Sequence, residues 1–441
     1  MIRICMVGTG YVGLVSGACM ADFGHTVTCV DINAERIESL RKGGIPFYEP
    51  GLDRLVLKNV DGQLLFFTTE LAEGMKDADV VFIAVQTPMS PSGEADLQFV
   101  MKVGEEIGSL LDDHKVIVTK STVPVGTNRQ LRKVIQGQIK HDVTFDMASN
   151  PEFLREGSSI EDFMRPDRVV IGVESDHAEE LLRELYRPLF LLDTPIVKTG
   201  IETAELIKYA SNSFLAVKIS FINEMAALAE TVGADVSHVA KAMGLDKRIG
   251  PKFLHAGLGF GGSCLPKDTN AIVHIANSHD HDMSVVRAAI AVNAALPERA
   301  LAKAERLTGG LQGKTVAMLG LAFKPNTDDI RSSATLPLVD GLKKLGCTVR
   351  AHDPAAMENF KFFHPDLVYT DSPYAACEGA EITILATEWN LYRQLDLDRV
   401  KSVMTGNAFL DCRNVYDRPH LERFGFKYDC FGRAAHISEV S

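Results

Sequence analysis

The sequence predicts an α/β protein with two doubly wound parallel sheets, joined by a long central helix and a helical segment. Three observations lead to this prediction: short apolar runs alternate with helical patterns, a long stretch of helical periodicity follows, and the alternation then returns. Strands that alternate with helices favour a parallel sheet, because each crossover helix returns the chain to the same edge. We therefore expect three domains, at residues 1–200, 201–298 and 299–441.

The first domain begins with a strand, a glycine-rich turn, a helix and a second strand. The stretch "IRICMVG" is followed by "TGYVGLVSGACMADFG" and then by "HTVTCVD". Further strands are expected at residues 79–86, 115–122, 145–153 and 168–173. Helical patterns lie between most of these runs, so a doubly wound parallel sheet is expected here.

The middle of the chain has the periodicity of one amphipathic helix, "ETAELIKYASNSFLAVKISFINEMAALAETVG". A helix over residues 201–232 is too long to be a mere connector, and we expect it to form the spine of a homodimer. Strand patterns return at residues 314–323, 347–353, 381–387 and 407–414. They predict a second α/β domain.

Composition argues against several classes of protein. The 441 residues are 46% apolar and 24% charged, as in a soluble globular protein. The net charge of −12 disfavours nucleic acid and anionic membrane as partners, so any anionic ligand must be held by locally placed Lys and Arg. Apolar runs fall short of the roughly 20 residues that span a membrane, and no secretory signal pattern is visible. We expect a cytoplasmic protein.

The spacing of cysteines and histidines predicts neither a disulfide framework nor a metal site. The 8 cysteines lie far apart and form no CxxC pair. The 13 histidines show no HExxH or comparable spacing. Most of the cysteines are expected to be small buried hydrophobic residues.

The turn "GTGYVG" predicts a dinucleotide site in a Rossmann-like domain. Gly8, Gly10 and Gly13 have the GxGxxG spacing directly after a strand and at the start of a helix, whose N-terminus can hold phosphates. Asp31 ends the second strand, where it would accept hydrogen bonds from both ribose hydroxyls and repel a 2′-phosphate, so NAD is favoured over NADP. Arg36 is expected to flank the adenine or to lie on a solvated helix face. The later "TVAMLGLAFKPNTDDIRSS" lacks the third glycine and should bind something else.

The stretch "GFGGSCLPKD", residues 259–268, predicts a reactive thiol. Cys264 follows two glycines and a serine and precedes Pro266, a residue tolerated in the first turn of a helix. A cysteine at a helix N-terminus with Lys267 nearby favours the thiolate and can act as a nucleophile. Asp268 lies four residues on and would face the same side. The alternative is an inert cysteine in a glycine-rich turn.

Two other segments have pairs of polar residues four positions apart. Glu152 and Glu156 lie in "NPEFLREGSS", and Lys208 and Asn212 lie in "AELIKYASNSF". On a helix, residues at this spacing share one face. A lysine and an asparagine that project together are suited to hold a developing oxyanion. The alternatives are a solvated glutamate pair and a lysine whose stem covers apolar surface.

Six motifs together resemble one enzyme family. The stretches "GTGYVG", "KSTVPVGT", "NPEFLREG", "IKYASNSFLAVKISFINE", "GFGGSCLPKD" and "FKPNTDDIRSS" occur in the order and spacing of the UDP-glucose/GDP-mannose dehydrogenase family, from residue 1 to about 430. The stretch "GLDKRIGPKFLHAG" is similar to the branch that acts on UDP-glucose, rather than on GDP-mannose or UDP-N-acetylmannosamine. The resemblance implies oxidation of UDP-glucose at C6 to UDP-glucuronate, with two NAD+ and one water consumed.

The resemblance also implies a role for each reactive residue. Cys264 would capture the C6 aldehyde as a thiohemiacetal and then carry a thioester that water hydrolyses. Lys208 and Asn212 would stabilise oxyanions, while Asp268 would activate water or accept the first proton. The resemblance further places Thr122 beside the nicotinamide with a bound water, and Glu152 in the hydrolysis step. The general base of each half-reaction stays open.

The binding residues that the resemblance implies fall into two groups. Beyond the glycines, Asp31 and Arg36, the cofactor group is Tyr11, Val12, Thr87, Pro88, Thr122, Glu156, Lys267 and Arg331. The substrate group is Glu152, Phe153, Leu154, Arg155, Lys208, Asn212, Phe253, Leu254, His255, Gly257, Phe260, Gly261 and Lys324. Arg248 would reach the substrate from the neighbouring subunit, and Arg413 is a candidate for the UDP side. His255 departs from the tyrosine or lysine often present there, which puts one pyrophosphate contact in doubt.

Two alternatives remain open at this point. One is a GDP-mannose dehydrogenase of the same family, and the other is a catalytically silent sugar-nucleotide or NAD sensor on the same scaffold. A sensor needs no nucleophile, so the presence of Cys264 with Lys208, Asn212 and Asp268 argues against it.

Overall fold

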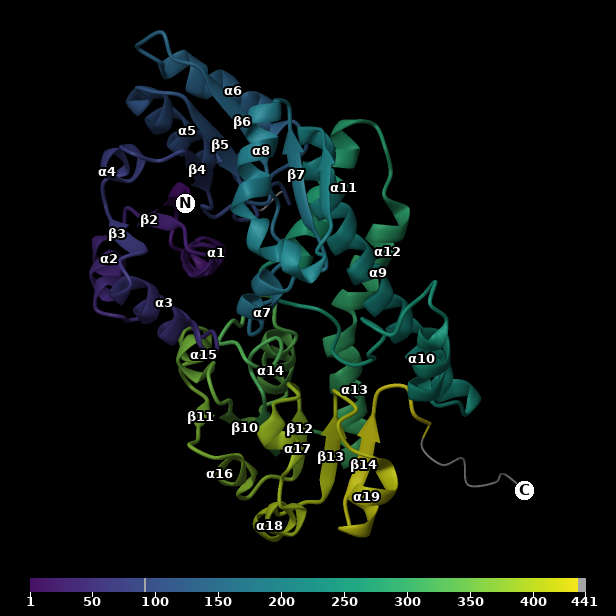
Figure 1. The fold of residues 1–441 in the computed structure, drawn as a ribbon. Coiled ribbons are helices and arrows are strands. Elements are labelled where there is room, and N and C mark those ends of the chain that lie inside the picture. Colours follow the sequence, from purple (N-terminus) through teal and green to yellow (C-terminus); the bar gives the residue numbers. More distant parts are fainter. Residues whose placement is uncertain (91–92, 435–441) are drawn as a thin grey trace. The chain divides into compact units, whose positions relative to one another are not determined.

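The computed structural model describes residues 1–90 and 93–434, and it has the predicted class of fold. The chain forms two compact units. Unit 1 comprises residues 1–211 and 274–280, and unit 2 comprises residues 212–273 and those from 281 onward. In Figure 1 the strands of each unit are flanked by helices.

Unit 1 contains an eight-stranded sheet with the order β3-β2-β1-β4-β5-β6-β7-β8. Its strands are β1 (Arg3–Val7), β2 (Thr26–Val30), β3 (Leu65–Thr68), β4 (Val80–Ile83), β5 (Lys115–Thr119), β6 (Phe145–Ser149), β7 (Val169–Val173) and β8 (Ile196–Thr199). The order reverses between β1 and β4, and ligands of open α/β sheets bind at such a switch point. All neighbouring strands are parallel except β6 and β7, which are antiparallel. The predicted parallel sheet is thus confirmed apart from this one pair, whose connection at residues 150–168 contains only the six-residue α7 in place of a full crossover helix.

The helices of unit 1 cover both faces of this sheet. They are α1 (Tyr11–Asp22), α2 (Ala34–Arg41), α3 (Leu52–Asp61), α4 (Leu71–Met75), α5 (Gln98–Leu110), α6 (Thr127–Gln138), α7 (Ser159–Met164), α8 (Asp176–Leu185) and the short 3-10 helix η1 (Arg187–Leu192). Along β1, Ile4 and Met6 pack in one core cluster while Cys5 and Val7 pack in the other. This alternation follows from the two-residue period of a strand and explains why both faces are apolar.

Unit 2 contains a six-stranded sheet with the order β11-β10-β9-β12-β13-β14, in which all neighbours are parallel. Its strands are β9 (Thr315–Leu319), β10 (Thr348–His352), β11 (Val368–Tyr369), β12 (Ile382–Leu385), β13 (Ala408–Asp411) and β14 (Lys427–Cys430). The helices after α9 are α10 (Val236–Leu245), α11 (Leu265–Ser278), α12 (Ser284–Ala294), α13 (Leu296–Thr308), α14 (Thr335–Lys344), α15 (Met357–Phe363), α16 (Pro373–Cys377), α17 (Asn390–Arg393), α18 (Leu397–Val403) and α19 (Arg418–Arg423). The boundary between the units falls within α9 and again within α11.

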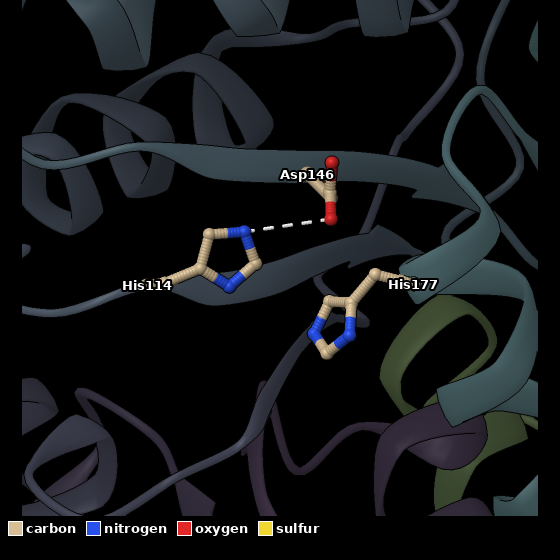
Figure 2. A group of neighbouring side chains, drawn as sticks. All are labelled: His114, Asp146 and His177. Carbon is tan, nitrogen blue, oxygen red and sulfur yellow. Dashed lines mark ion pairs between the residues drawn. The ribbon is translucent and has the colours of Figure 1, made fainter.

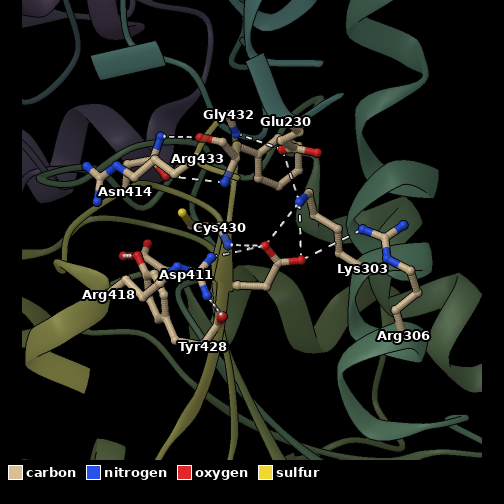
Figure 3. A network of polar contacts seen from close by, with 12 residues as sticks. Glu230, Lys303, Arg306, Asp411, Asn414, Arg418, Tyr428, Cys430, Gly432 and Arg433 are labelled. Carbon is tan, nitrogen blue, oxygen red and sulfur yellow. Dashed lines mark hydrogen bonds and ion pairs between the residues drawn. The ribbon is translucent and has the colours of Figure 1, made fainter. Parts of the chain in front are cut away.

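The predicted long helix is confirmed as α9 (Ile201–Val232). Within unit 2, a buried lysine ties its last turns to two other elements. Lys303 of α13 is 2% exposed, and its Nζ lies 3.0 Å from Glu230 Oε1 of α9 and 3.2 Å from Asp429 Oδ2 of β14 (Figure 3). Two carboxylates compensate one ammonium, so this buried charge is paired. Across the described residues, every helix is too short or too polar to cross a membrane.

Candidate active site

The glycine-rich turn after β1 has the tight geometry that the motif predicts. Gly8 has φ of +103°, and its N–H donates to the Val30 carbonyl at 2.7 Å. A Cβ on Gly13 would lie 1.9 Å from the Gly8 carbonyl oxygen, so any side chain there would push α1 off the turn. Gly10 precedes the first residues of α1, Tyr11 and Val12, and a Cβ on it would meet no atom within 4 Å. The start of α1 thus offers backbone N–H groups that a phosphate can approach.

Asp31 lies directly after β2 and faces this turn. Its Oδ2 accepts hydrogen bonds from the Thr9 N–H at 2.9 Å and the Thr9 hydroxyl at 2.7 Å, and the Arg36 guanidinium lies 3.2 Å away. Burial opposes ionisation, but the N–H groups of Asn33 and Thr9, with the Arg36 charge, lower the pKa of Asp31. Asp31 is therefore an anion fixed beside the turn. Sequence reasoning missed Thr9, although it lies inside the glycine motif.

Three further predicted cofactor residues lie in loops after β4 and β5, at the carboxyl edge of the sheet. Thr87 is buried, and its hydroxyl donates to the Thr122 carbonyl at 3.0 Å. Pro88 is exposed, and its carbonyl accepts from the Asp96 N–H at 2.8 Å. The Thr87 bond holds the two loops together at the edge where Asp31 also lies, and the Pro88 bond closes the loop after β4 on itself.

Tyr11 is held by a residue that sequence reasoning missed. Its hydroxyl donates to Glu49, which also accepts from the N–H groups of Gly157 at 2.5 Å and Ser159 at 2.8 Å. Burial, with the hydrogen bond to Glu49, raises the pKa of Tyr11. Glu49 lies in a loop with no motif around it, so no local signal could have identified it.

Glu152 and Lys208 form a buried ion pair in unit 1. Lys208 Nζ lies 2.9 Å from Glu152 Oε1, and the side chains are 3% and 5% exposed. The Leu154 N–H donates to the other oxygen of Glu152 at 2.6 Å. Burial opposes ionisation of Glu152, but the Lys208 ammonium and this N–H lower its pKa. The geometry excludes the solvated glutamate considered as an alternative.

The expectation that Glu152 and Glu156 share a helix face is wrong. Residues 150–158 are not helical, and α7 begins only at Ser159. Pro151 lacks an N–H, and Gly157 has φ of +79°, so neither suits a helix interior. Glu156 is half-buried, away from any helical pairing with Glu152.

The other residues of this segment have separate contacts. The Arg168 guanidinium lies 3.5 Å from the centroid of the Phe153 ring, and Lys208 Nζ lies 5.3 Å from the same centroid. Arg155 is exposed and forms a bidentate pair with Asp162, with contacts of 2.5 to 3.2 Å. Phe153 thus lies beside the buried pair, whereas Arg155 points to solvent.

Cys264 lies at the start of α11, as predicted. The helix begins at Leu265, and the Cys264 carbonyl accepts the first helical hydrogen bond from the Asp268 N–H at 2.9 Å. Its side chain is half-exposed, with Ser263 Oγ 3.7 Å from the sulfur. Six of the other cysteines are buried, as expected, and Cys347 is half-exposed. Cys264 is therefore an accessible thiol at a helix N-terminus, where a thiolate is favoured.

Asp268 connects Asn212 and Lys267 within unit 2. Asn212 Nδ2 donates to Asp268 Oδ2 at 2.6 Å, and Lys267 Nζ donates to Asp268 Oδ1 at 2.6 Å. Asp268 is completely buried. Both of its oxygens are engaged, so this carboxylate fixes the orientation of the Asn212 amide one helical turn after Lys208.

The glycine-rich approach to Cys264 packs closely against the loop after β9. A Cβ on Gly261 would lie 2.4 Å from the Ser332 carbonyl oxygen, and the Gly262 N–H donates to the Arg331 carbonyl at 2.8 Å. Phe260 is buried, and its backbone exchanges two hydrogen bonds with the Asn293 side chain, at 2.8 and 2.9 Å. The path of the chain into Cys264 is therefore fixed by tertiary contacts.

Arg413 and Lys324 follow β13 and β9, at the carboxyl edge of the second sheet. Arg413 donates to the carbonyls of Phe323 at 3.1 Å and Gly259 at 3.4 Å, and Lys324 Nζ lies 5.3 Å from the Phe323 ring centroid. Arg413, named as a candidate, thus ties the loop of Lys324 to the loop that precedes Cys264. Gly257 packs against this group, because a Cβ on it would lie 2.4 Å from the carbonyl oxygen of Cys412, the residue before Arg413.

The remaining predicted residues are more dispersed. Leu254 is buried, His255 is exposed, and Phe253 is half-buried with φ of +64°. Arg248 is 88% exposed and pairs with Asp246 at 2.6 Å, and Arg331 is also exposed and pairs with Asp329 at 2.7 Å. Neither arginine is joined by these contacts to Cys264 or to Lys324 in this chain.

Comparisons with known proteins agree along the whole chain. The models of the UDP-glucose/GDP-mannose dehydrogenase family match in order: the NAD binding domain at residues 2–190, the central domain at 202–295 and the UDP binding domain at 317–418. A UDP-glucose 6-dehydrogenase of Rhizobium meliloti is 48% identical over 440 residues, which cover 98% of this chain and 100% of the relative. The UDP-glucose 6-dehydrogenase TuaD of Bacillus subtilis is 45% identical over 436 residues, which cover 99% and 94%.

A solved structure gives the same result. The UDP-glucose dehydrogenase of the archaeon Pyrobaculum islandicum has a TM-score of 0.91 and 39% identity to this chain, with 99% of this chain and 98% of that one covered. The glycine turn with its anionic Asp31 fits the NAD binding domain, and the loops around Lys324 and Arg413 lie in the UDP binding domain. The chain therefore belongs to the UDP-glucose/GDP-mannose dehydrogenase family, and it is an NAD-dependent oxidoreductase.

Proposed function

We propose that the chain oxidises the C6 alcohol of UDP-glucose twice and releases UDP-glucuronate, with two NAD+ and one water consumed. The observation that carries this proposal is Cys264, a half-exposed thiol at the start of α11. Oxidation of an alcohol to an acid passes through an aldehyde, and a nucleophile that retains the aldehyde allows the second oxidation at the same site. The relatives named above act on UDP-glucose, which supports this substrate over GDP-mannose.

Cys264 supplies the covalent step. NAD+, when bound, accepts one hydride from C6 in each oxidation. After the first oxidation, the Cys264 thiolate adds to the aldehyde carbon, and the resulting oxyanion takes a proton to give a thiohemiacetal. Loss of that proton and a hydride gives a thioester. Water then attacks the thioester carbon, the C–S bond breaks, and the carboxylate leaves with the thiol restored.

The polar residues around these steps have different roles. Lys208 and Asn212 donate to the oxyanions, and Asp268 holds the Asn212 amide in place at 2.6 Å. Glu152 is kept ionised by Lys208, so it can accept a proton from the hydrolytic water. Thr122, after β5, supports the water and the nicotinamide side.

The binding residues form a cofactor group and a substrate group. Gly8, Gly10 and Gly13 with Tyr11 and Val12 hold the pyrophosphate of NAD, and Asp31, supported by Arg36, holds the adenosine ribose. Thr87, Pro88, Glu156, Lys267 and Arg331 complete the cofactor side. The substrate contacts are assigned to the segments that contain Phe153, Leu154, Arg155, Phe253, Leu254, His255, Gly257, Phe260, Gly261, Lys324 and Arg413.

We also propose that the protein is a homodimer built on α9. Phe214, Phe221 and Leu228 are exposed and lie seven residues apart, which places them along one stripe of the helix. A second copy would cover this apolar stripe. The exposed Arg248 would then be available to the neighbouring subunit.

The three-domain division and the cytoplasmic location also remain predictions.

The experiment that tests the function is a stoichiometric assay with UDP-glucose as the limiting substrate. We expect two NADH per UDP-glucose for the wild type, and at least about a 1,000-fold lower kcat for Cys264→Ala. Cys347→Ser is the matched control, because Cys347 is the other half-exposed thiol, and it should keep normal turnover. NADH from GDP-mannose alone would overturn the substrate, and NADH from neither sugar nucleotide would favour the sensor.

A further inference from the structure

A second buried lysine lies beside the Glu152–Lys208 pair. Lys120 follows β5 and is 3% exposed. Its Nζ donates to Asn150 Oδ1 at 3.0 Å and to the Tyr186 hydroxyl at 3.4 Å, and the Tyr186 hydroxyl donates to the same Asn150 oxygen at 2.6 Å. These partners are neutral, and within the described part of the chain no carboxylate forms an ion pair with Lys120.

Aromatic rings complete the surroundings of this ammonium. It lies 5.9 Å from the centroid of Phe82 and 5.8 Å from the centroid of Phe163. Ring faces attract cations, but far more weakly than a carboxylate does. A buried charge with so little compensation destabilises a fold, and it usually persists where function requires it.

The charge of Lys120 acts on the catalytic pair. The pKa of Lys120 is lowered to about 8, chiefly by burial. The Glu152 charge raises this pKa, the Lys208 charge lowers it, and Cys19 raises it by a smaller amount. In return, the Lys120 charge helps to lower the pKa of Glu152. One small cavity is lined by residues that include Lys120, Glu152, Asp162 and Arg168. With Lys208, which pairs with Glu152, three cations face two carboxylates, so an excess of positive charge remains at this site.

We propose that Lys120 is a positioning residue for the reaction: it holds an unpaired positive charge behind the Glu152–Lys208 pair, which keeps Glu152 ionised and favours oxyanions near Lys208. This inference rests on the roles given to Glu152 and Lys208 in the proposed function. The excess positive charge is already in place before an oxyanion forms, so the protein needs no rearrangement when the oxyanion forms. Below a pH of about 8 Lys120 is protonated, and activity should fall as the pH rises through that value.

The test compares Lys120→Met, Lys120→Arg and a matched control, Lys303→Met. Lys303 is equally buried but is paired with Glu230 and Asp429. We expect Lys120→Met to keep or raise the Tm while kcat falls at least about tenfold and the decline near pH 8 disappears. Lys120→Arg should restore most of the kcat and move the decline to higher pH. Lys303→Met should lower the Tm, because Glu230 and Asp429 lose their shared buried cation and keep only their arginine partners, and should keep the pH profile.

Two results would overturn this proposal. The first is a Lys120→Met variant that keeps the wild-type kcat and still loses activity as the pH rises through about 8. The other is a lower Tm in that variant with an unchanged pH profile, which would make Lys120 purely structural. Failure of the proposed function is distinguishable, because the wild type itself would then produce no NADH from UDP-glucose.

An independent observation points to a metal site at the opposite edge of the same sheet. Figure 2 shows His114, Asp146 and His177 grouped together. His114 directly precedes β5, Asp146 lies in β6 and His177 lies in the first turn of α8. These positions are at the starting ends of β5 and β6, whereas Thr122 and Glu152 follow the other ends. The three ligands are 32 and 31 residues apart in the chain, so no spacing motif could have revealed them.

The ligand set and its spacing suit a divalent transition metal. The three candidate ligand atoms lie within 4.8 Å of one another, and His114 Nε2 is 3.4 Å from Asp146 Oδ2. Ligands about 2.0 to 2.2 Å from a tetrahedral Zn²⁺ are roughly 3.3 to 3.5 Å apart. His114 and His177 are exposed side chains, and their ring centroids are 5.1 Å apart. We infer that these residues bind Zn²⁺ with water in the fourth position.

Zinc titration by calorimetry tests this inference in the Cys264→Ser/Cys347→Ser background, which removes both half-exposed thiols as competing ligands. We expect one site of micromolar affinity and a higher Tm with zinc. The variants His114→Ala and His177→Ala should each weaken binding at least about tenfold, while the exposed His281→Ala should not. Equal binding by all four proteins, or no binding by any, would overturn the site. The result does not depend on catalysis.

Discussion

The two sheets of this protein begin with the same arrangement and use it differently. Strands β3-β2-β1-β4-β5-β6 of the first sheet have the same order as β11-β10-β9-β12-β13-β14 of the second. In both, an aspartate follows the second strand and accepts hydrogen bonds from the turn after the first strand. Asp31 accepts from the Thr9 N–H at 2.9 Å, and Asp353 accepts from the Leu321 N–H at 2.7 Å.

The neighbours of each aspartate decide its role. Asp353 also accepts from the N–H groups of Ala355 and Ala356, each at 2.9 Å, and from the Trp389 indole at 3.1 Å, and it is completely buried. The Asp31 side chain keeps 10% of its surface exposed. A carboxylate surrounded by internal donors supports the turn, whereas one with free accepting capacity can bind a ribose.

The helices after the two turns differ as well. In the first sheet α1 begins at Tyr11, directly after the glycine turn, whereas α14 begins at Thr335, 15 residues after Gly320. The second turn therefore has no helix N-terminus at the place where a pyrophosphate would bind. The same strand order thus supports a dinucleotide site in one sheet and a different kind of site in the other.

The largest expected effect comes from a pair of glycine substitutions. Gly13→Ala places a Cβ 1.9 Å from the Gly8 carbonyl oxygen, and Gly320→Ala places one 2.4 Å from Thr387 at φ of +100°. Both should lower the free energy of unfolding by about 2 to 3 kcal/mol, measured by urea denaturation. Only Gly13→Ala should weaken NAD binding, by at least about 100-fold in calorimetry. Equal loss of NAD binding in both variants would refute the division of roles.

An intermediate effect is expected from the two aspartates. Asp31→Asn removes a charged acceptor, so NAD affinity should fall roughly 10- to 100-fold and the preference over NADP should shrink, as measured by titration with both cofactors. Asp353→Asn should leave the NAD affinity unchanged but reduce stability by about 1 to 3 kcal/mol, because it weakens several buried hydrogen bonds. A change of NAD affinity in Asp353→Asn would contradict this assignment.

The ionisation of Asp31 adds a pH dependence to this pair. The folded protein lowers the pKa of Asp31 below 3.8, so its stabilising contribution is fully present above that value and is lost as the pH falls through the lower folded value. The stability difference between the wild type and Asp31→Asn should therefore be constant above about pH 5 and shrink below about pH 4. Urea denaturation across this range measures it, and a difference that shrinks at neutral pH would count against an anionic Asp31.

The smallest effect is expected for Arg36→Ala. The guanidinium lies 3.2 Å from Asp31, but its side chain is 36% exposed. Such a pair contributes less than about 1 kcal/mol, so NAD affinity should change no more than roughly threefold. A larger loss in the same titration would show that Arg36 contacts the cofactor directly instead of only supporting Asp31.

Local signals in the sequence were sufficient for much of the fold. Buried strands such as β4 and the 32 residues of α9 have clear periodicity, whereas the four short edge strands β3, β8, β11 and β14 were missed. The antiparallel β7 has the composition of a buried parallel strand, so its direction could not be inferred. In the site, glycine and proline around Cys264 placed it at a helix start correctly. The contact of Lys120 with Tyr186, 66 residues away, leaves no such trace.

The unbroken helix α9 has a consequence for how this chain can change. Lys208 and Asn212 are four residues apart in it, which corresponds to a rise of about 6 Å and little more than one full turn. Inserting a single residue between them would rotate one side chain by about 100° relative to the other. The proposed joint action of Lys208 and Asn212 therefore requires the angular phase of this one turn to stay constant.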